Sequence, residues 1–181
     1  MTGAKDSEEA IRLVAEGKEA FRLDGKVAIV TGAGTGIGQA IALGLASAGA
    51  DIAALYRNDI DQTLAQLSSL PVKSASYRCD LEQASESELV ELVGSIEQDF
   101  GGLDILVNNA GMIHVAPALD YPLAEWHRTL QINLTSAFLL SKVVGRSFIS
   151  RESGGRVVNI ASLLSFLGGD SVVAYTASKS A

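Results

Sequence analysis

The chain has 181 residues, 48% of them hydrophobic and 19% charged, which suits one globular domain with a buried core and excludes a disordered chain. Its 14 Lys and Arg residues against 21 Asp and Glu residues give a net charge of −7, which argues against nucleic acid and anionic membranes as partners. The charged N-terminus does not fit a secretory signal, and the single cysteine, Cys79, can form no internal disulfide, so we expect a cytoplasmic protein.

Short β-rich runs alternate with helical patterns from residue 25 onward. Residues 1–24 precede this pattern and are expected to be a loosely attached extension. The expected strands are residues 26–30, 51–56, 72–77, 105–107 and 156–160. The expected helices are a first one that ends at Gly49, with Ile37, Ile41 and Leu45 on one face, then residues 60–70, 85–100 and 123–148, and a last one that carries Tyr175. This alternation predicts an α/β fold, a Rossmann-like doubly wound parallel sheet, over residues 25–181.

A glycine-rich turn separates the first strand from the first helix, at Gly32, Gly34, Gly36 and Gly38. Glycines here let the backbone turn tightly and bring the N-terminus of the helix against a pyrophosphate. The common dinucleotide fingerprint does not fit, because the sixth position counted from Gly32 is Ile37, and no P-loop is present. The pattern is instead Gly-x-x-x-Gly-x-Gly.

Tyr175 and Lys179 lie four positions apart on the last predicted helix, so their side chains share a face. A cation held near a phenol favours the phenolate and brings its pKa down towards the working range. Such a group can pass a proton to and from a substrate oxygen. The alternative is a surface helix with an aromatic anchor and a solvated lysine.

Four segments, in this order, resemble the motifs of the short-chain dehydrogenase/reductase family. They are residues 31–38, 108–111, 159–162 and the Tyr-x-x-x-Lys pattern of residues 175–179. The resemblance implies a nicotinamide cofactor lying across the carboxyl ends of the strands. It also implies hydride transfer between the nicotinamide and a carbonyl or secondary alcohol of a small molecule.

The family roles carry over by position to cofactor-binding candidates along the whole chain. The resemblance places at the cofactor Gly32, Thr35, Gly36, Ile37, Gly38, Arg57, Asp80, Leu81, Asn109, Ala110, Gly111, Tyr175 and Lys179. Taken alone, residues 108–111 could form an ordinary turn, and Asp80 could be a helix cap.

The same resemblance gives four catalytic candidates. Tyr175 would be the acid or base, Lys179 would lower its pKa and hold the nicotinamide ribose, and Ser162 would hydrogen-bond the substrate oxygen. Asn133 matches the fourth residue, whose main-chain group holds a water that links Lys179 to solvent. By itself, Asn133 could also be a tolerated polar residue that faces solvent. His114 and His127 lack the spacing of metal ligands, so no metal is expected.

Arg57, at the end of the second predicted strand, favours NADP, because a 2′-phosphate requires a cation where NAD enzymes place a carboxylate. Thr35 stands where the family has its second basic residue, so NAD remains open. Residues 159–169 with 174–181 resemble the branch of 2-deoxy-D-gluconate 3-dehydrogenase and 2-dehydro-3-deoxy-D-gluconate 5-dehydrogenase. The nearest alternative is 3-oxoacyl-carrier-protein reductase.

Family members generally run well past residue 181, adding strands beyond the fifth. We therefore expect the N-terminal part of a reductase, which would form a homodimer or homotetramer in its full length. The sheet would be incomplete at its C-terminal side, with an open edge and exposed apolar surface at the fifth strand. The alternative is a truncated, catalytically incompetent product that acts only as a dinucleotide-binding or dimerisation module.

Overall fold

The structure is a computed structural model that describes residues 21–152 and 154–181. Most of the predicted extension, residues 1–20, lies outside the described residues. The part that follows is attached to the domain, because the backbone N–H of Leu23 donates to the carbonyl of Ala48 at 2.7 Å. The Leu23 side chain also packs against the hydrophobic core.

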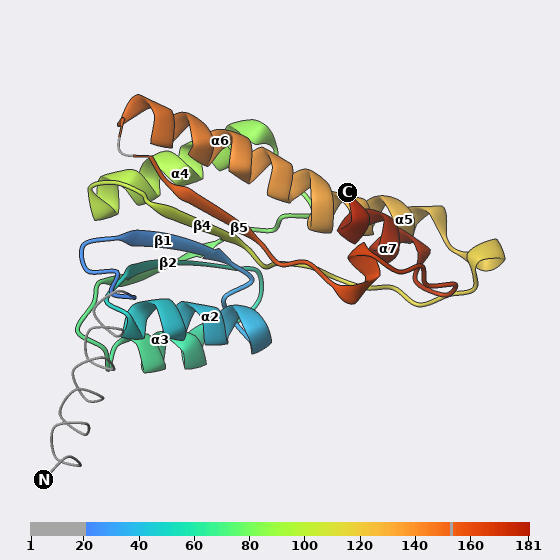
Figure 1. Cartoon of the computed structure of the whole chain (residues 1–181), viewed down its shortest axis with the longest axis horizontal. Coiled ribbons are helices and arrows are strands. Elements are labelled where there is room, and N and C mark those ends of the chain that lie inside the picture. The colour runs from blue at the N-terminus through green and yellow to red at the C-terminus, as the bar shows by residue number, and fades with distance from the viewer. Residues whose placement is uncertain (1–20, 153) are drawn as a thin grey trace, which may run out of the picture.

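Five parallel strands form one sheet in the order β3-β2-β1-β4-β5 (Figure 1). Val30 of the central strand lies beside Ala54 on one side and Val107 on the other. This arrangement confirms the predicted doubly wound α/β fold, with small shifts at the ends of the strands. The strands are β1 (Val27–Thr31), β2 (Asp51–Tyr56), β3 (Ser74–Arg78), β4 (Ile105–Asn108) and β5 (Arg156–Asn159).

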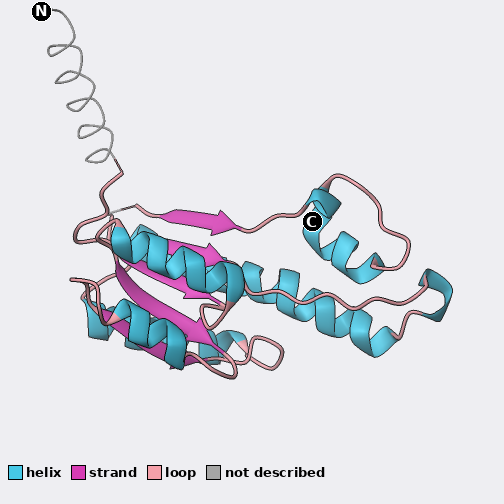
Figure 2. Ribbon diagram, turned by 90° about the horizontal axis from the view of Figure 1, so that it is seen from below, coloured by secondary structure: helices cyan, strands magenta, loops and turns pink. Residues whose placement is uncertain are grey.

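Helices cover both faces of the sheet, as the continuous apolar runs of the central strands require. Alternate residues of β1 point to opposite faces of the sheet. Val27 and Ile29 pack in one core cluster, and Ala28 and Val30 pack in the other. Figures 1 and 2 show the two helical layers on opposite sides of the strands. One layer contains α2 (Gly36–Ser47) and α3 (Asp61–Leu67), and the other contains α4 (Glu86–Phe100) and α6 (Ser136–Ser150).

Helix α4 begins where the sequence predicts it. The Ser85 hydroxyl accepts from the backbone N–H of Glu88, and the Glu88 carboxylate accepts from the backbone N–H of Ser85. This reciprocal pair is a capping box that fixes the first turn. Leu89, Val93 and Ile96 are buried against the sheet.

Helix α2 packs two of the three residues of its predicted apolar face, Ile41 and Leu45, against the core, where they are partly buried. Its buried residues are Gly38, Ala42 and Ala46, whereas Ile37 is 66% exposed. Small residues four positions apart let the helix approach the sheet closely, so the larger apolar residues are displaced to its flanks. The small buried residues were not predicted, because hydrophobicity alone does not reveal how close a helix lies to its sheet.

The predicted helix 123–148 is interrupted. It consists of α5 (Leu123–Leu130), a π-helical segment η2 (Gln131–Thr135) and α6. Figures 1 and 2 show α5 continuing the line of α6 beyond the carboxyl ends of the strands. The last helix, α7 (Val173–Ser180), packs against α5 and η2 there.

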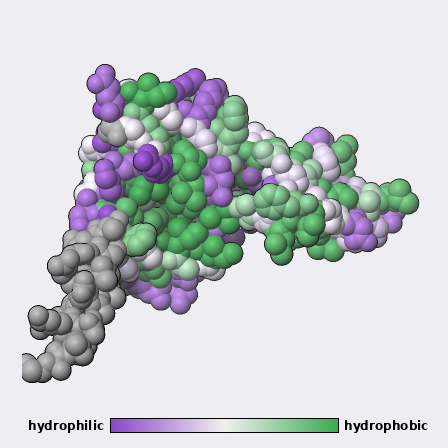
Figure 3. Space-filling view, viewed as in Figure 1, coloured by the Kyte–Doolittle hydropathy of each residue, from purple (hydrophilic) through white to green (hydrophobic). Residues whose placement is uncertain are grey.

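Strand β5 ends the sheet, and its valines Val157 and Val158 are 41% and 44% exposed. Figure 3 shows hydrophobic surface across the middle of this face, along β5 and towards α2. The expected exposed edge is therefore present. In the described parts of the chain, no helix has both the length and the apolar character to cross a membrane.

Candidate functional site

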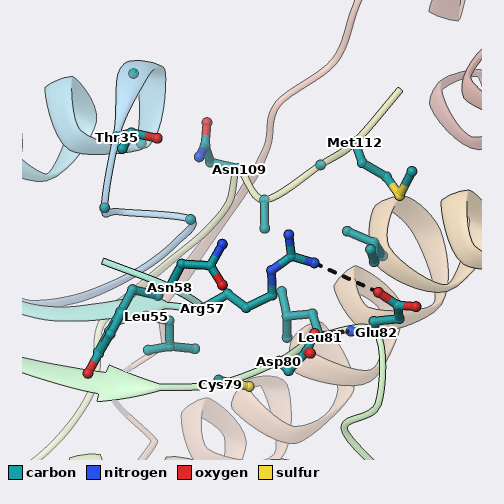
Figure 4. A pocket seen from close by; sticks show the side chains of 18 of the residues that line it. Thr35, Leu55, Arg57, Asn58, Cys79, Asp80, Leu81, Glu82, Asn109 and Met112 are labelled. Atoms are coloured by element: carbon teal, nitrogen blue, oxygen red, sulfur yellow. Dashed lines mark hydrogen bonds and ion pairs between the residues drawn. The ribbon is translucent and has the colours of Figure 1, made fainter. Parts of the chain in front are cut away.

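A pocket of about 510 Å³ lies at the carboxyl ends of β1, β2, β3 and β4 (Figure 4). Parallel sheets bind ligands at this edge, where the connections to the two helical layers diverge. Every predicted cofactor residue lines the pocket except Tyr175 and Lys179. The sequence reasoning missed other lining residues, among them Asn58, Asp59, Cys79, Glu82, Met112 and Ile132.

The glycine turn brings the N-terminus of α2 to the pocket. Gly36 has a φ of +57°, a left-handed conformation that favours glycine. A methyl group at Gly38 would overlap the Gly32 carbonyl oxygen and the Asn109 side chain. The first turn of α2 carries no acidic residue, so its free N–H groups and partial positive charge can face an anion.

The floor of the pocket is held by Thr31, a buried residue at the end of β1. Its hydroxyl oxygen accepts from the backbone N–H groups of Asn109 and Ala110, each at 2.9 Å. The Asn109 side-chain amide donates in turn to the Thr31 carbonyl at 2.9 Å. Residues 108–111 are thus fixed to β1 and do not form an isolated turn. The signal for Thr31 was a hydroxyl residue directly before the first glycine.

Asp80 caps the turn that follows β3. Its carboxylate accepts from the backbone N–H of Glu82 at 3.1 Å, and its carbonyl accepts from the N–H groups of Gln83 and Ala84. Asp80 therefore caps a turn, whereas the N-cap of the next helix, α4, is Ser85. The cap leaves Asp80 and Leu81 at the wall of the pocket.

Arg57 extends into the pocket from the end of β2 towards Glu82 (Figure 4). Its Nη1 lies 3.7 Å from Glu82 Oε2. The same carboxylate oxygen accepts a hydrogen bond from Arg128 Nε of α5 at 2.9 Å. This contact with Glu82 is the first cause that raises the pKa of Arg128. Arg57 therefore has a carboxylate within ion-pair distance.

Cys79 lines the pocket between these elements and is half-buried. Burial, followed by the charges of Asp80 and Glu88, raises the pKa of its thiol to about 11. The thiol is consequently protonated at neutral pH.

Tyr175 and Lys179 lie together on α7 and do not line the pocket. Lys179 Nζ lies 5.9 Å from the centroid of the Tyr175 ring and donates to the Ile160 carbonyl at 2.6 Å. Burial lowers the pKa of Lys179. Ser162 follows β5, and its hydroxyl accepts from the backbone N–H of Leu164 at 3.2 Å, which caps a short 3₁₀ turn, η3 (Leu163–Ser165).

Asn133 connects the pocket to α7. It is 7% exposed, so the alternative of a solvent-facing residue is wrong. Its side-chain oxygen accepts from Met112 N–H at 2.8 Å, and its amide donates to the Met112 carbonyl at 2.9 Å and to the Ser178 hydroxyl at 3.0 Å. Ser178 donates to the Tyr175 carbonyl at 2.8 Å. Ser178, which the sequence reasoning missed, thus links Asn133 to the helix of Tyr175.

Metal chemistry finds no support in the described residues, where no group of three or more His, Cys, Asp or Glu side chains could hold an ion. His114 lies 3.7 Å from Glu125 and edge-on to Tyr121. His127 is exposed on α5.

The model of the short chain dehydrogenase family matches residues 26–181. The 2-dehydro-3-deoxy-D-gluconate 5-dehydrogenase of Escherichia coli K12 is 42% identical over 161 residues, which cover 89% of this chain and 63% of that enzyme. The chain thus spans somewhat less than two thirds of the curated relatives that it resembles.

Solved structures similar to this chain are also named as dehydrogenases. A xylitol dehydrogenase with bound NAD+ is 41% identical, with a TM-score of 0.82 over 87% of this chain and 60% of that one. A protein of Agrobacterium tumefaciens with bound NADP, provisionally assigned as a 2-deoxy-D-gluconate 3-dehydrogenase, is 37% identical. Its TM-score is 0.79 over 88% of this chain and 62% of that one.

Proposed function

Since the chain belongs to the short-chain dehydrogenase family, we propose that it acts in hydride transfer between a nicotinamide dinucleotide and a carbonyl or secondary alcohol. The observation that carries this proposal is the pocket, in which the N-terminus of α2 and the Thr31–Asn109 floor meet at the carboxyl ends of the strands. Residues 25–181 would form the dinucleotide-binding domain.

The pocket fits the dinucleotide in shape and in charge. The turn at Gly36 and Gly38 leaves a surface without side chains against which a pyrophosphate can lie, and the N–H groups of α2 provide its hydrogen-bond donors. Asp80 and Leu81 would border the adenine, and Asn109 to Gly111 would support the cofactor from behind. When bound, the dinucleotide supplies the hydride acceptor or donor.

Four residues of this chain would serve the chemistry. Tyr175 would donate a proton to, or accept one from, the substrate oxygen, and the Ser162 hydroxyl would hydrogen-bond that oxygen. Lys179 would hold the nicotinamide ribose and favour the Tyr175 phenolate through its charge. Asn133 lies in the π-helical segment, where a main-chain carbonyl can be released to a water, and it connects to α7 through Ser178.

The substrate is proposed to be a sugar acid or polyol. The support is the names of relatives about 40% identical, a 2-dehydro-3-deoxy-D-gluconate 5-dehydrogenase and a xylitol dehydrogenase. A homo-oligomer is also proposed, because Leu123 of α5 and Phe138 and Ile149 of α6 are exposed apolar residues on one helical rod. The acidic composition and the single cysteine support a cytoplasmic location.

The test is cofactor binding by the purified chain, followed by NADPH and NADH fluorescence. Saturable binding of at least one cofactor is expected, and Gly38→Ala should weaken it more than tenfold because the new methyl group enters the pyrophosphate turn. With a sugar acid or polyol as substrate, Tyr175→Phe should lower kcat roughly 10²-fold to 10⁴-fold while cofactor binding stays within twofold. Absence of saturable binding for both cofactors would contradict the proposal.

A further inference from the structure

Charge at the adenosine end of the pocket is unevenly distributed. Among the described residues that line the pocket, Arg57 is the single Lys or Arg, whereas Asp59, Asp80 and Glu82 are carboxylates. Of these three, Glu82 lies within ion-pair distance of Arg57, at 3.7 Å. A ligand phosphate that approaches Arg57 therefore meets a guanidinium that already has an anionic partner.

Glu82 is held in place from two other directions. Its backbone N–H donates to the Asp80 carboxylate at 3.1 Å, which fixes the turn that carries it. Its Oε2 accepts from Arg128 Nε at 2.9 Å, and Arg128 also lies 3.8 Å from Glu125 within α5. One carboxylate oxygen is thus shared between a cation inside the pocket, Arg57, and a cation behind it, Arg128 (Figure 4 shows the Arg57 contact).

We propose that Glu82 is the residue that sets the choice between NADP and NAD, and that Arg128 is its positioning residue. The inference rests on the proposed dinucleotide function. A 2′-phosphate must share Arg57 with Glu82 and is repelled by the Glu82 charge, whereas a 2′-hydroxyl experiences neither effect. Arg128 weakens this opposition, because it takes part of the hydrogen-bonding capacity of Glu82 and adds a positive charge behind it.

The size of the effect follows from the contact geometry. Arg57 and Glu82 have side chains that are 45% and 26% exposed, so the interaction is screened by solvent. Two unit charges about 4 Å apart in a water-like environment change a binding constant roughly fivefold, and partial burial of Glu82 increases this to roughly tenfold. The preference between NADP and NAD would change by the same factor.

Isothermal titration calorimetry with 2′-phospho-ADP-ribose and ADP-ribose tests the proposal at the adenosine end alone, because neither probe has a nicotinamide ring. Glu82→Gln should tighten binding of the 2′-phosphate probe about fivefold to tenfold and change ADP-ribose binding less than twofold. Arg128→Gln should weaken the 2′-phosphate probe about threefold to fivefold, again with little change for ADP-ribose. Glu82→Ala should change the ratio of the affinities for the two probes in the same direction as Glu82→Gln.

A double variant separates positioning by Arg128 from a direct contact with phosphate. If Arg128 acts through Glu82, Arg128→Gln should have an effect below twofold in the Glu82→Gln background. The matched control is Glu86→Gln, which removes another carboxylate shared by two cations, Lys142 and Arg146, on α4 and away from the pocket. Glu86→Gln should leave the affinities for both probes unchanged.

Each failure has its own signature. If Glu82→Gln and Glu82→Ala bind both probes with the wild-type ratio, the role of Glu82 is overturned while the proposed dinucleotide function stands. If Arg128→Gln keeps its full effect without Glu82, the positioning role is overturned. If folded wild-type protein binds neither probe nor NADPH nor NADH, the dinucleotide function is overturned, and this inference with it.

Discussion

Thr31 and Asn109 lie 78 positions apart in the chain, and Asn109 donates two hydrogen bonds of 2.9 Å to Thr31, from its backbone N–H to the hydroxyl and from its side-chain amide to the carbonyl. Thr31→Val keeps the shape but leaves the N–H groups of Asn109 and Ala110 without their acceptor. We expect a loss of about 2 kcal/mol in the free energy of unfolding, measured by urea denaturation. Thr31→Ser, which keeps the hydroxyl, should retain most of the free energy of unfolding of the wild type. Equal losses for the two variants would show that the hydroxyl does not hold this floor.

Two glycines of α2 allow a matched comparison. Gly38→Ala introduces a methyl group that overlaps the Gly32 carbonyl. We therefore expect the free energy of unfolding to fall by more than about 2 kcal/mol. Gly44→Ala places the same methyl group in open space in the interior of the same helix, and should stabilise the protein by about 0.5–1 kcal/mol. Thermal unfolding of both variants measures the difference. If both changes had the same sign, close packing at Gly38 would not be the cause.

Asn133→Ala removes a buried side chain with three hydrogen-bond partners on Met112 and Ser178. Because the Met112 N–H would be left unpaired, we expect a loss of about 2–3 kcal/mol in urea denaturation. Hydrogen exchange should also be faster at the Met112 amide. Gln98→Ala, an exposed amide on α4, is the control and should stay within about 0.5 kcal/mol of the wild type. An unchanged Met112 exchange rate would disprove this role of the Asn133 side chain.

Cys79 provides a pH-dependent measurement, since it is the single cysteine of the chain. With a thiol pKa of about 11, alkylation by iodoacetamide at pH 8 should be at least about tenfold slower in the folded than in the urea-unfolded chain. The folded rate should then rise about tenfold per pH unit up to pH 10. Because the unfolded chain loses this proton first, the shift lowers folding stability as pH rises from about 8.5 towards 11. A plateau of the folded rate below pH 9 would contradict the raised pKa.

Much of the fold could be predicted from the sequence, because alternating apolar runs and turn residues are local signals. All five strands form where the β-rich runs occur, and Tyr175 and Lys179 come together through a helical spacing of four. The small buried residues of α2, Gly38, Ala42 and Ala46, were not predicted, because their burial depends on the closeness of a sheet that the local pattern does not contain. Residues that act through distant partners, such as Glu82 and Ser178, had no periodic signal and emerged only with the tertiary structure.

The π-helical segment η2 lies between α5 and α6 and changes the direction in which the side chains of α5 point relative to those of α6. A π turn contains one residue more than an α-helical turn, and one residue corresponds to about 100° of rotation about the helix axis. Without that extra residue, α5 would be turned by about this angle relative to the part of the rod that packs on the sheet. Arg128 would then point away from Glu82, and the surface that α5 offers to α7 would be a different one. The segment thus allows α6 to pack on the sheet while Arg128 of α5 faces Glu82 at the pocket.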